Sequence, residues 1–358
     1  MINVTKTFLP SFEEYTYFLK KAWDNSWVTN NGQLLQELEL KLKEYLGVKN
    51  LLVSGNGTIV LQLALKALNI KNEVITTPFS YVATTNAILW EGCKPVFVDI
   101  DSETFCIDVD KIEAAITSKT EAILATHVYG IPCDVEKIEL IAKRYQLKVI
   151  YDAAHSFAVK YKGNSILNYG DVSTSSFHAT KIFHTVEGGC IVCNDDELND
   201  KLILYRSFGH KGDDYYLAGI NGKNSEMHAA MGLSNLLHIS EILARRKNQW
   251  LRYSELLKNS NFQFLKIDPT VSYNYAYFPI VFESELNMLD TLEELKKKQI
   301  IPRRYFYPSL NSLPYLDHQS CPVAESISTR VICLPLYHDL LEEEQDLIVE
   351  IILKEQNK

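Results

Sequence analysis

Residues 148–155 read KVIYDAAH, and residues 176–189 read SFHATKIFHTVEGG. The first stretch predicts a buried β-strand that ends at the acid Asp152, and the second places Lys181 on the loop after the next strand. In open α/β sheets, ligands bind just beyond the carboxyl ends of the strands. We therefore expect Asp152 and Lys181 to face one site. Each residue also has an ordinary alternative role, because an aspartate before two alanines can cap a helix and most lysines are solvated surface groups.

An acid and a lysine in this order are what pyridoxal 5'-phosphate (PLP) requires. The lysine amine condenses with the aldehyde of the cofactor, and the acid pairs with its pyridine nitrogen. Partial desolvation would lower the pKa of Lys181 and leave its amine reactive at neutral pH. We expect His155, one turn beyond Asp152, to bond or pack beside the cofactor ring. The two stretches together therefore predict a PLP site.

Two further turns supply residues for such a cofactor. SGNGT at residues 54–58 follows a predicted strand and opens a helix, where exposed N–H groups bind phosphate and glycine lets the backbone come close. We expect Gly57, Thr58 and Ser176 to bind the phosphate, although a turn with two glycines is more often only a turn. PFSYVATTN at residues 78–86 follows the next strand. We expect Tyr81 in it to stack on the cofactor ring, and ordinary core packing is the alternative.

Short β-branched runs alternate with amphipathic stretches through the first two thirds of the chain. The predicted strands are residues 50–53, 73–76, 95–100, 121–128, 148–152, 172–177 and 190–194, with helices such as 58–68 and 135–145 between them. Strands separated by helices pair in parallel, and their apolar character suits strands covered on both faces. We therefore predict an α/β fold in which residues 1–235 form a mostly parallel seven-stranded sheet between helices.

The last third of the chain has a different pattern. A long helical run covers residues 225–260, and beyond it we predict strands at 275–282 and 330–334 and helices at 285–298 and 342–353. We therefore expect residues 236–358 to form a smaller C-terminal α+β domain.

The composition narrows the classes of partner. A net charge of −9 argues against general nucleic-acid binding, which needs a basic face. No stretch reaches the length of a membrane span and the first residues do not begin a signal peptide, so we expect a cytoplasmic protein that binds no membrane. The seven cysteines are an odd number without disulfide spacing. Cys190 and Cys193 have the spacing of a redox or zinc motif, but we favour a buried strand there and predict no metal site.

Taken together, these motifs resemble the DegT-type sugar-nucleotide aminotransferases, which are PLP enzymes of the aspartate-aminotransferase fold, fold type I. The resemblance covers nearly the whole chain and includes WVTNNG at 27–32, SGNGT at 54–58, HVYG at 127–130 and CPVAE at 321–325. It implies that Lys181 binds the cofactor covalently, that Asp152 meets the pyridine nitrogen and that Tyr81 stacks on the ring. It also implies that Gly57, Thr58 and Ser176 hold the phosphate.

The resemblance further implies a homodimer in which each active site is completed by the neighbouring subunit. Asn221 matches a residue that reaches the other subunit's cofactor phosphate. GKN at 222–224 departs from the family pattern, in which an aromatic, an arginine and a methionine are common, and Lys223 would bring positive charge near the phosphates. PRRYFYP at 302–308 matches a segment at the substrate entrance. The residues expected to bind substrate are Thr29, Asn31, His210, Lys223, Arg303 and Tyr305, with a surface turn as the alternative for the arginine pair.

The resemblance also implies an activity. Relatives that act as dehydratases carry histidine in place of the lysine, so Lys181 favours transamination, and VEGG at 186–189 resembles the C4-specific rather than the C3-specific members. The expected reaction moves the amino group of L-glutamate to C4 of dTDP-4-keto-6-deoxy-D-glucose and gives dTDP-4-amino-4,6-dideoxy-D-glucose for a surface polysaccharide such as the O-antigen of lipopolysaccharide. The alternatives are amination at C3, another sugar epimer, or a non-enzymatic regulator with the same fold.

Overall fold

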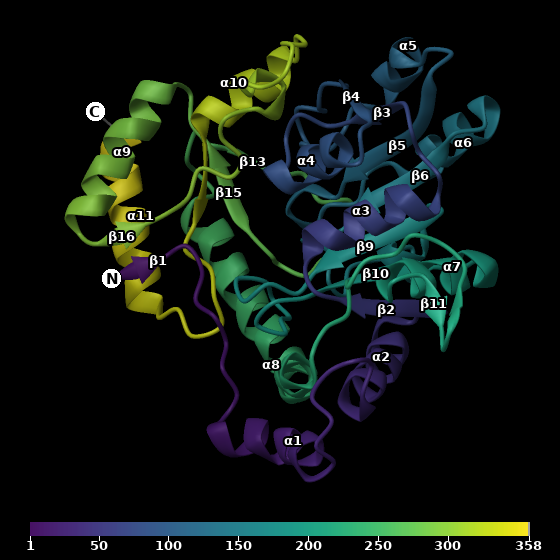
Figure 1. Ribbon diagram of the computed structural model, residues 1–358. Coiled ribbons are helices and arrows are strands. Elements are labelled where there is room, and N and C mark those ends of the chain that lie inside the picture. The colour runs from purple at the N-terminus through teal and green to yellow at the C-terminus, as the bar shows by residue number, and fades with distance from the viewer. Residues whose placement is uncertain (357–358) are drawn as a thin grey trace.

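A seven-stranded sheet forms the centre of the larger part of the molecule (Figure 1). The computed structural model describes residues 1–356. In spatial order the strands are β2 (Asn50–Ser54), β10 (Gly189–Cys193), β9 (Val172–Ser176), β6 (Lys148–Asp152), β5 (Thr120–Thr126), β3 (Glu73–Thr76) and β4 (Lys94–Phe97). Only β10 runs antiparallel to its two neighbours in this sheet. The predicted α/β fold with a mostly parallel seven-stranded sheet is confirmed.

Helices cover both faces of the sheet because its strands are apolar on both sides. In β5, Ala122 and Leu124 belong to one core cluster, whereas Ile123 and Ala125 belong to another, as the alternation of side chains along a strand requires. The first cluster is covered by α3 (Gly57–Ala67), α4 (Val82–Trp90) and α7 (Asp196–Arg206). The second is covered by α2 (Gln33–Leu46), α6 (Val135–Tyr145) and α8 (Glu226–Leu256).

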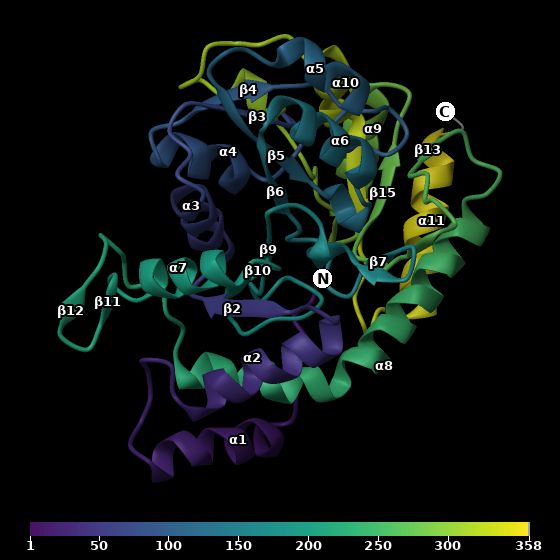
Figure 2. The same cartoon turned by 90° about the vertical axis from the view of Figure 1, so that its right-hand side faces the viewer.

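A second, antiparallel sheet consists of β13 (Gln263–Phe264), β15 (Phe278–Val281) and β17 (Val331–Leu334). It shares a core with α9 (Glu285–Lys297) and α11 (Glu342–Gln356). Figure 2 shows α8 running from beneath α2 to α11, so this helix contacts both parts of the molecule. β1 (Ile2–Asn3) pairs in parallel with β16 (Ile300–Ile301), which places the N-terminus beside the second sheet. The domain boundary at residues 235/236 falls within α8 and stays a prediction.

The remaining elements are short or lie at the surface. They are α1 (Phe12–Asp24), α5 (Ile112–Ala115), α10 (Pro322–Arg330), β7 (Lys160–Tyr161), β8 (Asn164–Ser165), β11 (His210–Lys211), β12 (Asp214–Tyr215), β14 (Val271–Ser272) and four 3-10 turns at Val109–Lys111, Val128–Gly130, Ile166–Asn168 and Leu310–Ser312. Among residues 1–356, no helix combines the length and the apolar character needed to cross a membrane.

Most predicted strands match, but three predicted strands run too long. After β4 the chain turns away and Ile100 forms an isolated bridge with Ile107. After β5 it enters a 3-10 turn in which Tyr129 has a positive φ. β15 begins only at Phe278, because Tyr275 also adopts a positive φ and cannot continue a strand. In each case the apolar pattern continues beyond the point where pairing ends.

The CxxC spacing at Cys190 and Cys193 belongs to a buried strand, as predicted. Both residues lie in β10, and their side chains enter different core clusters on opposite faces of the sheet. Two thiols on opposite faces cannot bind one metal ion or each other. All seven cysteines of the chain are free and buried.

A buried ion pair fixes the edge of the sheet that carries the SGNGT turn. Arg206, at the end of α7, is 3% exposed, and its guanidinium lies 2.6 Å from the Glu39 carboxylate of α2. The same guanidinium donates to the Val53 carbonyl of β2 at 2.7 Å, and Glu39 accepts the Val53 N–H at 2.8 Å. The pair therefore connects two helices and the strand that precedes the turn.

Removing one partner of this pair should destabilise the protein more than removing both. We expect Glu39→Leu to lower the free energy of unfolding by roughly 3 kcal/mol, because it leaves the buried Arg206 charge uncompensated. The double variant Glu39→Leu/Arg206→Met should lose less. Urea unfolding followed by circular dichroism measures both, and a single variant as stable as the wild type would contradict this role.

Candidate active site

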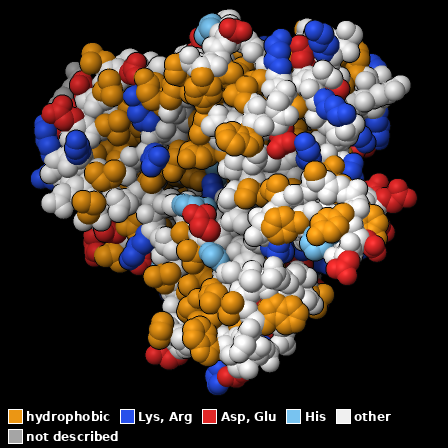
Figure 3. All heavy atoms as spheres, viewed as in Figure 1, with side chains coloured by type: hydrophobic (Ala, Val, Ile, Leu, Met, Phe, Trp, Pro, Cys, Tyr) orange, Lys and Arg blue, Asp and Glu red, His pale blue; other side chains and the backbone are white. Residues whose placement is uncertain are grey.

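A cavity of about 320 Å³ lies at the carboxyl ends of the central strands. Figure 3 shows a hollow in the middle of the viewed face, between the parts that hold the two sheets, where basic, acidic and histidine side chains meet. The residues that line the cavity are Asn56, Gly57, Thr58, Leu61, Ser80, Tyr81, Ala83, Thr126, Asp152, Ala154, His155, Ser176, His178, Thr180, Lys181, Glu187, Tyr277, Arg303, Tyr305 and Phe306. Nine of the residues predicted from the sequence are among them.

Asp152 ends β6 and is 5% exposed. One carboxylate oxygen accepts the Ala154 N–H at 3.1 Å, and the other accepts the Thr84 hydroxyl at 2.7 Å. Burial raises the pKa of Asp152, and these two hydrogen bonds and the positive charge of Lys181 oppose that rise. No helix begins directly after Asp152, so the alternative role of this residue as a helix cap is wrong.

Lys181 lies on the loop between β9 and β10. It lines the same cavity as Asp152, and the two side chains interact through their opposite charges. Its backbone N–H donates to the His178 carbonyl at 2.9 Å, which closes a tight turn and directs the side chain into the cavity. Burial lowers the pKa of Lys181 to about 8, and the negative charge of Asp152 opposes that shift. A larger share of its amine is therefore neutral, and nucleophilic, than for a lysine at the surface.

The SGNGT turn approaches Ser176 closely at another part of the cavity. A Cβ on Gly57 would lie 2.9 Å from the Ser176 Cβ, so only glycine fits without displacement. Asn56 caps α3 by accepting the N–H groups of Thr58 and Ile59 at 3.0 and 2.9 Å. These two N–H groups are therefore already bonded, which leaves the Thr58 and Ser176 hydroxyls and the Gly57 backbone as the groups that face the cavity.

Aromatic rings and one arginine form the rest of the lining. Tyr81 precedes α4 and is 56% exposed. The His155 ring lies parallel to Phe306, with 5.6 Å between centroids, and its Nδ1 accepts the Tyr129 N–H at 3.2 Å. Burial lowers the pKa of His155 well below its ordinary value, so the ring is neutral. The Arg303 guanidinium lies over the Tyr305 ring, 5.1 Å from its centroid.

Five predicted site residues do not line this cavity. Lys223 donates to the Asn221 carboxamide oxygen at 2.7 Å and lies 4.6 Å from the centroid of the Phe208 ring. His210 belongs to the exposed hairpin of β11 and β12, whereas Asn31 lies against Arg206 and Thr29 lies on the preceding loop. A role for these five residues in this chain's own cavity finds no support in the geometry.

Several lining residues were not predicted. Asn56 and Ser80 lie within the two quoted turns, so their chemistry was visible in the sequence but their direction was not. Tyr277 comes from the last third of the chain, and no local pattern connects it with Asp152. Phe306 lies within the segment 302–308 that the resemblance places at the substrate entrance. His178, Thr180 and Glu187 flank Lys181, where His178 Nδ1 and the Thr180 hydroxyl are 2.8 Å apart.

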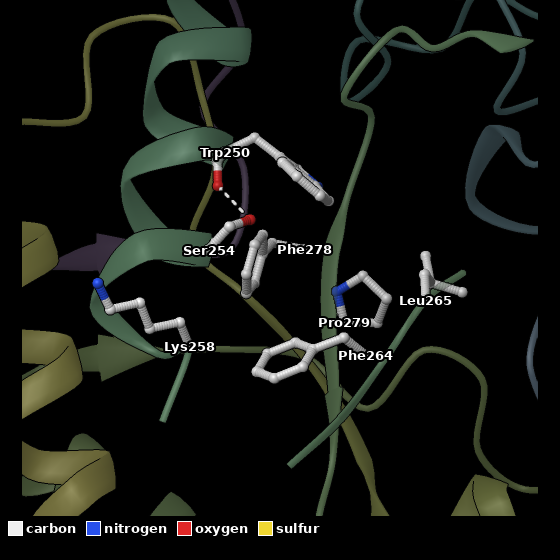
Figure 4. A pocket seen from close by; sticks show the side chains of 7 residues that line it. All are labelled: Trp250, Ser254, Lys258, Phe264, Leu265, Phe278 and Pro279. Carbon is white, nitrogen blue, oxygen red and sulfur yellow. Dashed lines mark hydrogen bonds between the residues drawn. The ribbon is translucent and has the colours of Figure 1, made fainter. Parts of the chain in front are cut away.

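A second hollow of about 240 Å³ lies on the small sheet and is chiefly apolar (Figure 4). It is lined by Trp250, Ser254, Lys258, Phe264, Leu265, Phe278 and Pro279, and the Ser254 hydroxyl donates to the Trp250 carbonyl at 3.0 Å. Lys258 is its one ionisable lining residue. Of these two cavities, only the first brings several ionisable side chains together, including Asp152, His155 and Lys181.

The first cavity fits PLP in its donor set. A buried carboxylate can meet a protonated pyridine nitrogen, and a lysine with a lowered pKa can bond the aldehyde. The close approach of Gly57 to Ser176 leaves a cradle in which a side chain at position 57 would clash. Hydroxyls of Thr58 and Ser176 suit a phosphate.

Comparison with known proteins agrees with this geometry. Residues 12–353 match the DegT/DnrJ/EryC1/StrS aminotransferase family. The chain is 44% identical to a dTDP-4-amino-4,6-dideoxy-D-glucose transaminase from Shigella dysenteriae, over 98% of each chain. It superimposes on the structure of DesI in the presence of its TDP-sugar product with a TM-score of 0.94 and 29% identity, covering 99% of this chain and 93% of that one.

The PLP form of Spr1654, a sugar aminotransferase from Streptococcus pneumoniae described as putative, is also similar, with a TM-score of 0.91 and 26% identity over 99% of each chain. The match of residues 12–353 covers nearly all of the sequence, including every residue that lines the cavity. The chain belongs to the DegT/DnrJ/EryC1/StrS aminotransferase family and is a PLP-dependent sugar-nucleotide aminotransferase.

Proposed function

We propose that this enzyme transfers the amino group of L-glutamate to C4 of dTDP-4-keto-6-deoxy-D-glucose and forms dTDP-4-amino-4,6-dideoxy-D-glucose. The observation that carries the proposal is the pairing of Lys181 with Asp152 in a cavity of a chain this similar to the Shigella transaminase. The reaction has two halves. L-Glutamate gives up its amino group and leaves as 2-oxoglutarate, and the keto sugar then receives that group.

Lys181 and Asp152 have complementary roles in this proposal. Bound PLP supplies an electron sink that weakens the C–H bond beside the substrate nitrogen and carries the amino group between the two substrates. Lys181 holds the cofactor covalently and, once substrate has displaced it, moves a proton to or from the carbon that carries the nitrogen. Its lowered pKa lets it accept and return that proton near neutral pH. Asp152 keeps the pyridine nitrogen protonated.

The other lining residues orient cofactor and substrate. We assign Gly57, Thr58 and Ser176 to the cofactor phosphate, Tyr81 to stacking on one face of the ring, and the neutral His155 to a place beside the ring. Arg303 and Tyr305 are assigned to an anionic part of the substrates, either a glutamate carboxylate or the sugar diphosphate. An arginine suits either anion because its guanidinium can donate two parallel hydrogen bonds.

We further propose a homodimer in which Asn221 acts on the partner's cofactor phosphate, with Thr29, Asn31, His210 and Lys223 contributing to the partner's substrate site. Large apolar side chains support a partner surface around α1, since an exposed apolar patch is characteristic of an interface. They include Phe12, Tyr17, Trp23 and Trp27, which are 74%, 68%, 67% and 53% exposed. In Figure 3, hydrophobic side chains gather at the lower part of the face, where Figure 1 places α1. Assignment to the cytoplasm and to O-antigen assembly stays a prediction.

The substrate assignment predicts one product. Enzyme loaded with PLP and given ¹⁵N-labelled L-glutamate should move the label to C4 of dTDP-4-keto-6-deoxy-D-glucose with release of 2-oxoglutarate, as nuclear magnetic resonance of the product would report. Label at C4 in the other configuration would establish the other epimer. Transfer only to a 3-keto sugar would establish the C3 alternative, and no transfer with any keto sugar nucleotide would refute the proposed function. Lys181→Ala should transfer no label, whereas Lys119→Ala, an exposed lysine before β5, should behave as wild type.

The pKa of Lys181 predicts how cofactor capture depends on pH. Only the neutral amine attacks the aldehyde, so the initial rate of PLP capture by the apoenzyme should rise with pH and reach half its maximum near pH 8. In Asp152→Asn the negative charge that raises the pKa of Lys181 is gone, so the midpoint should move to lower pH. Stopped-flow absorbance measures the rate. A midpoint at the ordinary lysine value of 10.5, or a move to higher pH in Asp152→Asn, would contradict the arrangement.

Shared active sites predict complementation between two inactive variants. Lys181→Ala lacks the proton-transfer amine, and Asn221→Ala/Lys223→Ala lacks the groups assigned to the partner's cofactor phosphate and substrate. After subunit exchange, a mixed dimer contains one site with all of these residues intact, so activity should return above that of either variant alone. Mixed dimers, separated by two different affinity tags, that stay as inactive as their parents would argue that each subunit acts alone.

A further inference from the structure

Three buried hydroxyl side chains lead to Asp152 from one side of the cavity. Ser80 lies on the turn after β3, Thr84 lies in α4, and Thr126 ends β5. They are 2%, 0% and 3% exposed. Ser80 and Thr126 line the cavity, whereas Thr84 lies behind them against the carboxylate. Residues from three separate elements thus meet at one buried acid.

The hydrogen bonds among these residues run in one direction. Thr84 donates its hydroxyl hydrogen to Asp152 at 2.7 Å. The Ser80 and Thr84 oxygens are 2.7 Å apart, and Ser80 must be the donor because the single hydrogen of Thr84 is already given to the carboxylate. Thr126 in turn donates to Ser80 at 3.0 Å. Each hydroxyl polarises the next, which strengthens the last bond, the one to Asp152.

The other ionisable groups around Asp152 act on the carboxylate differently from this chain of hydroxyls. Lys181 faces the carboxylate across the cavity and stabilises its charge. His155 and His127 are neutral, because burial lowers the pKa of His155 well below its ordinary value and that of His127 to about 3. If Lys181 bonds the cofactor aldehyde, as proposed above, its free ammonium group would no longer be available to Asp152. The hydroxyl chain and the Ala154 N–H then remain as the fixed donors to Asp152.

We propose that Thr84 is a positioning residue of the aminotransfer reaction, and that its hydroxyl, oriented by Ser80 and Thr126, holds the Asp152 carboxylate ionised and correctly turned for the pyridine nitrogen. The inference rests on the proposed assignment of Asp152 to that nitrogen. Thr84 contacts neither substrate nor cofactor in this assignment and acts through Asp152 alone. Its effect is therefore on the charge that the carboxylate presents to the cofactor.

The neighbouring residue provides a matched control. Thr85 lies in the same helix and is also 0% exposed, but among residues 1–356 its hydroxyl has no hydrogen-bond partner. Valine in place of threonine replaces the hydroxyl by a methyl group at either position. A change that depends on burial or helix packing should therefore appear in both variants. A change that depends on the bond to Asp152 should appear only at position 84.

The experiment compares Thr84→Val, Thr84→Ser and Thr85→Val. The first readout is the PLP dissociation constant, obtained by titrating apoenzyme with PLP and following visible absorbance, which requires no sugar substrate. The second is the pH profile of kcat. We expect Thr84→Val to weaken PLP binding about tenfold, since a hydrogen bond to a charged group is lost. Thr84→Ser should restore tight binding, and Thr85→Val should match the wild type.

The sign of the pH effect follows from the same bond. Loss of a donor to the carboxylate favours its protonated form, so the pKa of Asp152 rises further and the acidic limb of the kcat profile should move to higher pH in Thr84→Val. If Thr84→Val is too unstable to purify, Ser80→Ala removes the preceding donor and should shift both readouts in the same direction by less.

Three outcomes would overturn the inference. Thr84→Val could bind PLP as tightly as Thr85→Val, Thr84→Ser could fail to restore binding, or Thr84→Val could lower the melting temperature while leaving the acidic limb unchanged. The last two would show that Thr84 serves packing only. Failure of the wild type to aminate any keto sugar nucleotide would instead refute the proposed substrate, and the PLP titrations would still test Thr84.

Discussion

The active site depends on one constraint, which is that a carboxylate and an amine share one cavity, in which Asp152 is buried and Lys181 is partly buried. Burial raises the pKa of Asp152 and lowers that of Lys181, and each charge partly offsets the shift of the other. An isolated buried charge would be costly, so neither group suits this place without its partner and its hydrogen bonds. The pairing of β6 with β9, which sets Asp152 opposite Thr174, brings the loop that carries Lys181 to the end of the strand that carries Asp152.

The rest of the fold serves to keep this pair in place. Side chains on the two faces of the sheet enter two separate cores, which hold the sheet between its helices. The Arg206–Glu39 pair fixes the edge strand that precedes the SGNGT turn, and Gly57 lets that turn approach Ser176. Tyr277 and Phe306, from the part of the chain that forms the small sheet, close the cavity from the other side. Catalysis by such a site relies on groups that are oriented before the substrate arrives.

The sequence allowed the local features to be predicted and left the long-range ones open. Strands 73–76 and 148–152 match the structure residue for residue, because short apolar runs with clear ends specify their own limits. Asp152, Lys181 and the SGNGT turn share one cavity, as expected from their places after predicted strands. Tyr277 could not be connected with Asp152, since no local pattern shows which distant segment closes a cavity. Thr84 and Thr85 are adjacent and chemically identical, so only the direction of each side chain separates a donor to Asp152 from an unpartnered hydroxyl. The capping box of Ser11 and Glu14 that begins α1 was visible in the sequence as SFEE, yet α1 was not predicted.

We infer that Lys181 is the residue to which PLP is bound and that Asp152 lies beside it for the pyridine nitrogen. Reduction of the PLP-loaded enzyme with borohydride, followed by proteolysis and mass spectrometry of the labelled peptide, tests the assignment of Lys181. We expect one labelled site, Lys181, and loss of the label in Lys181→Ala. A label on another lysine, or labelling that persists in Lys181→Ala, would contradict it.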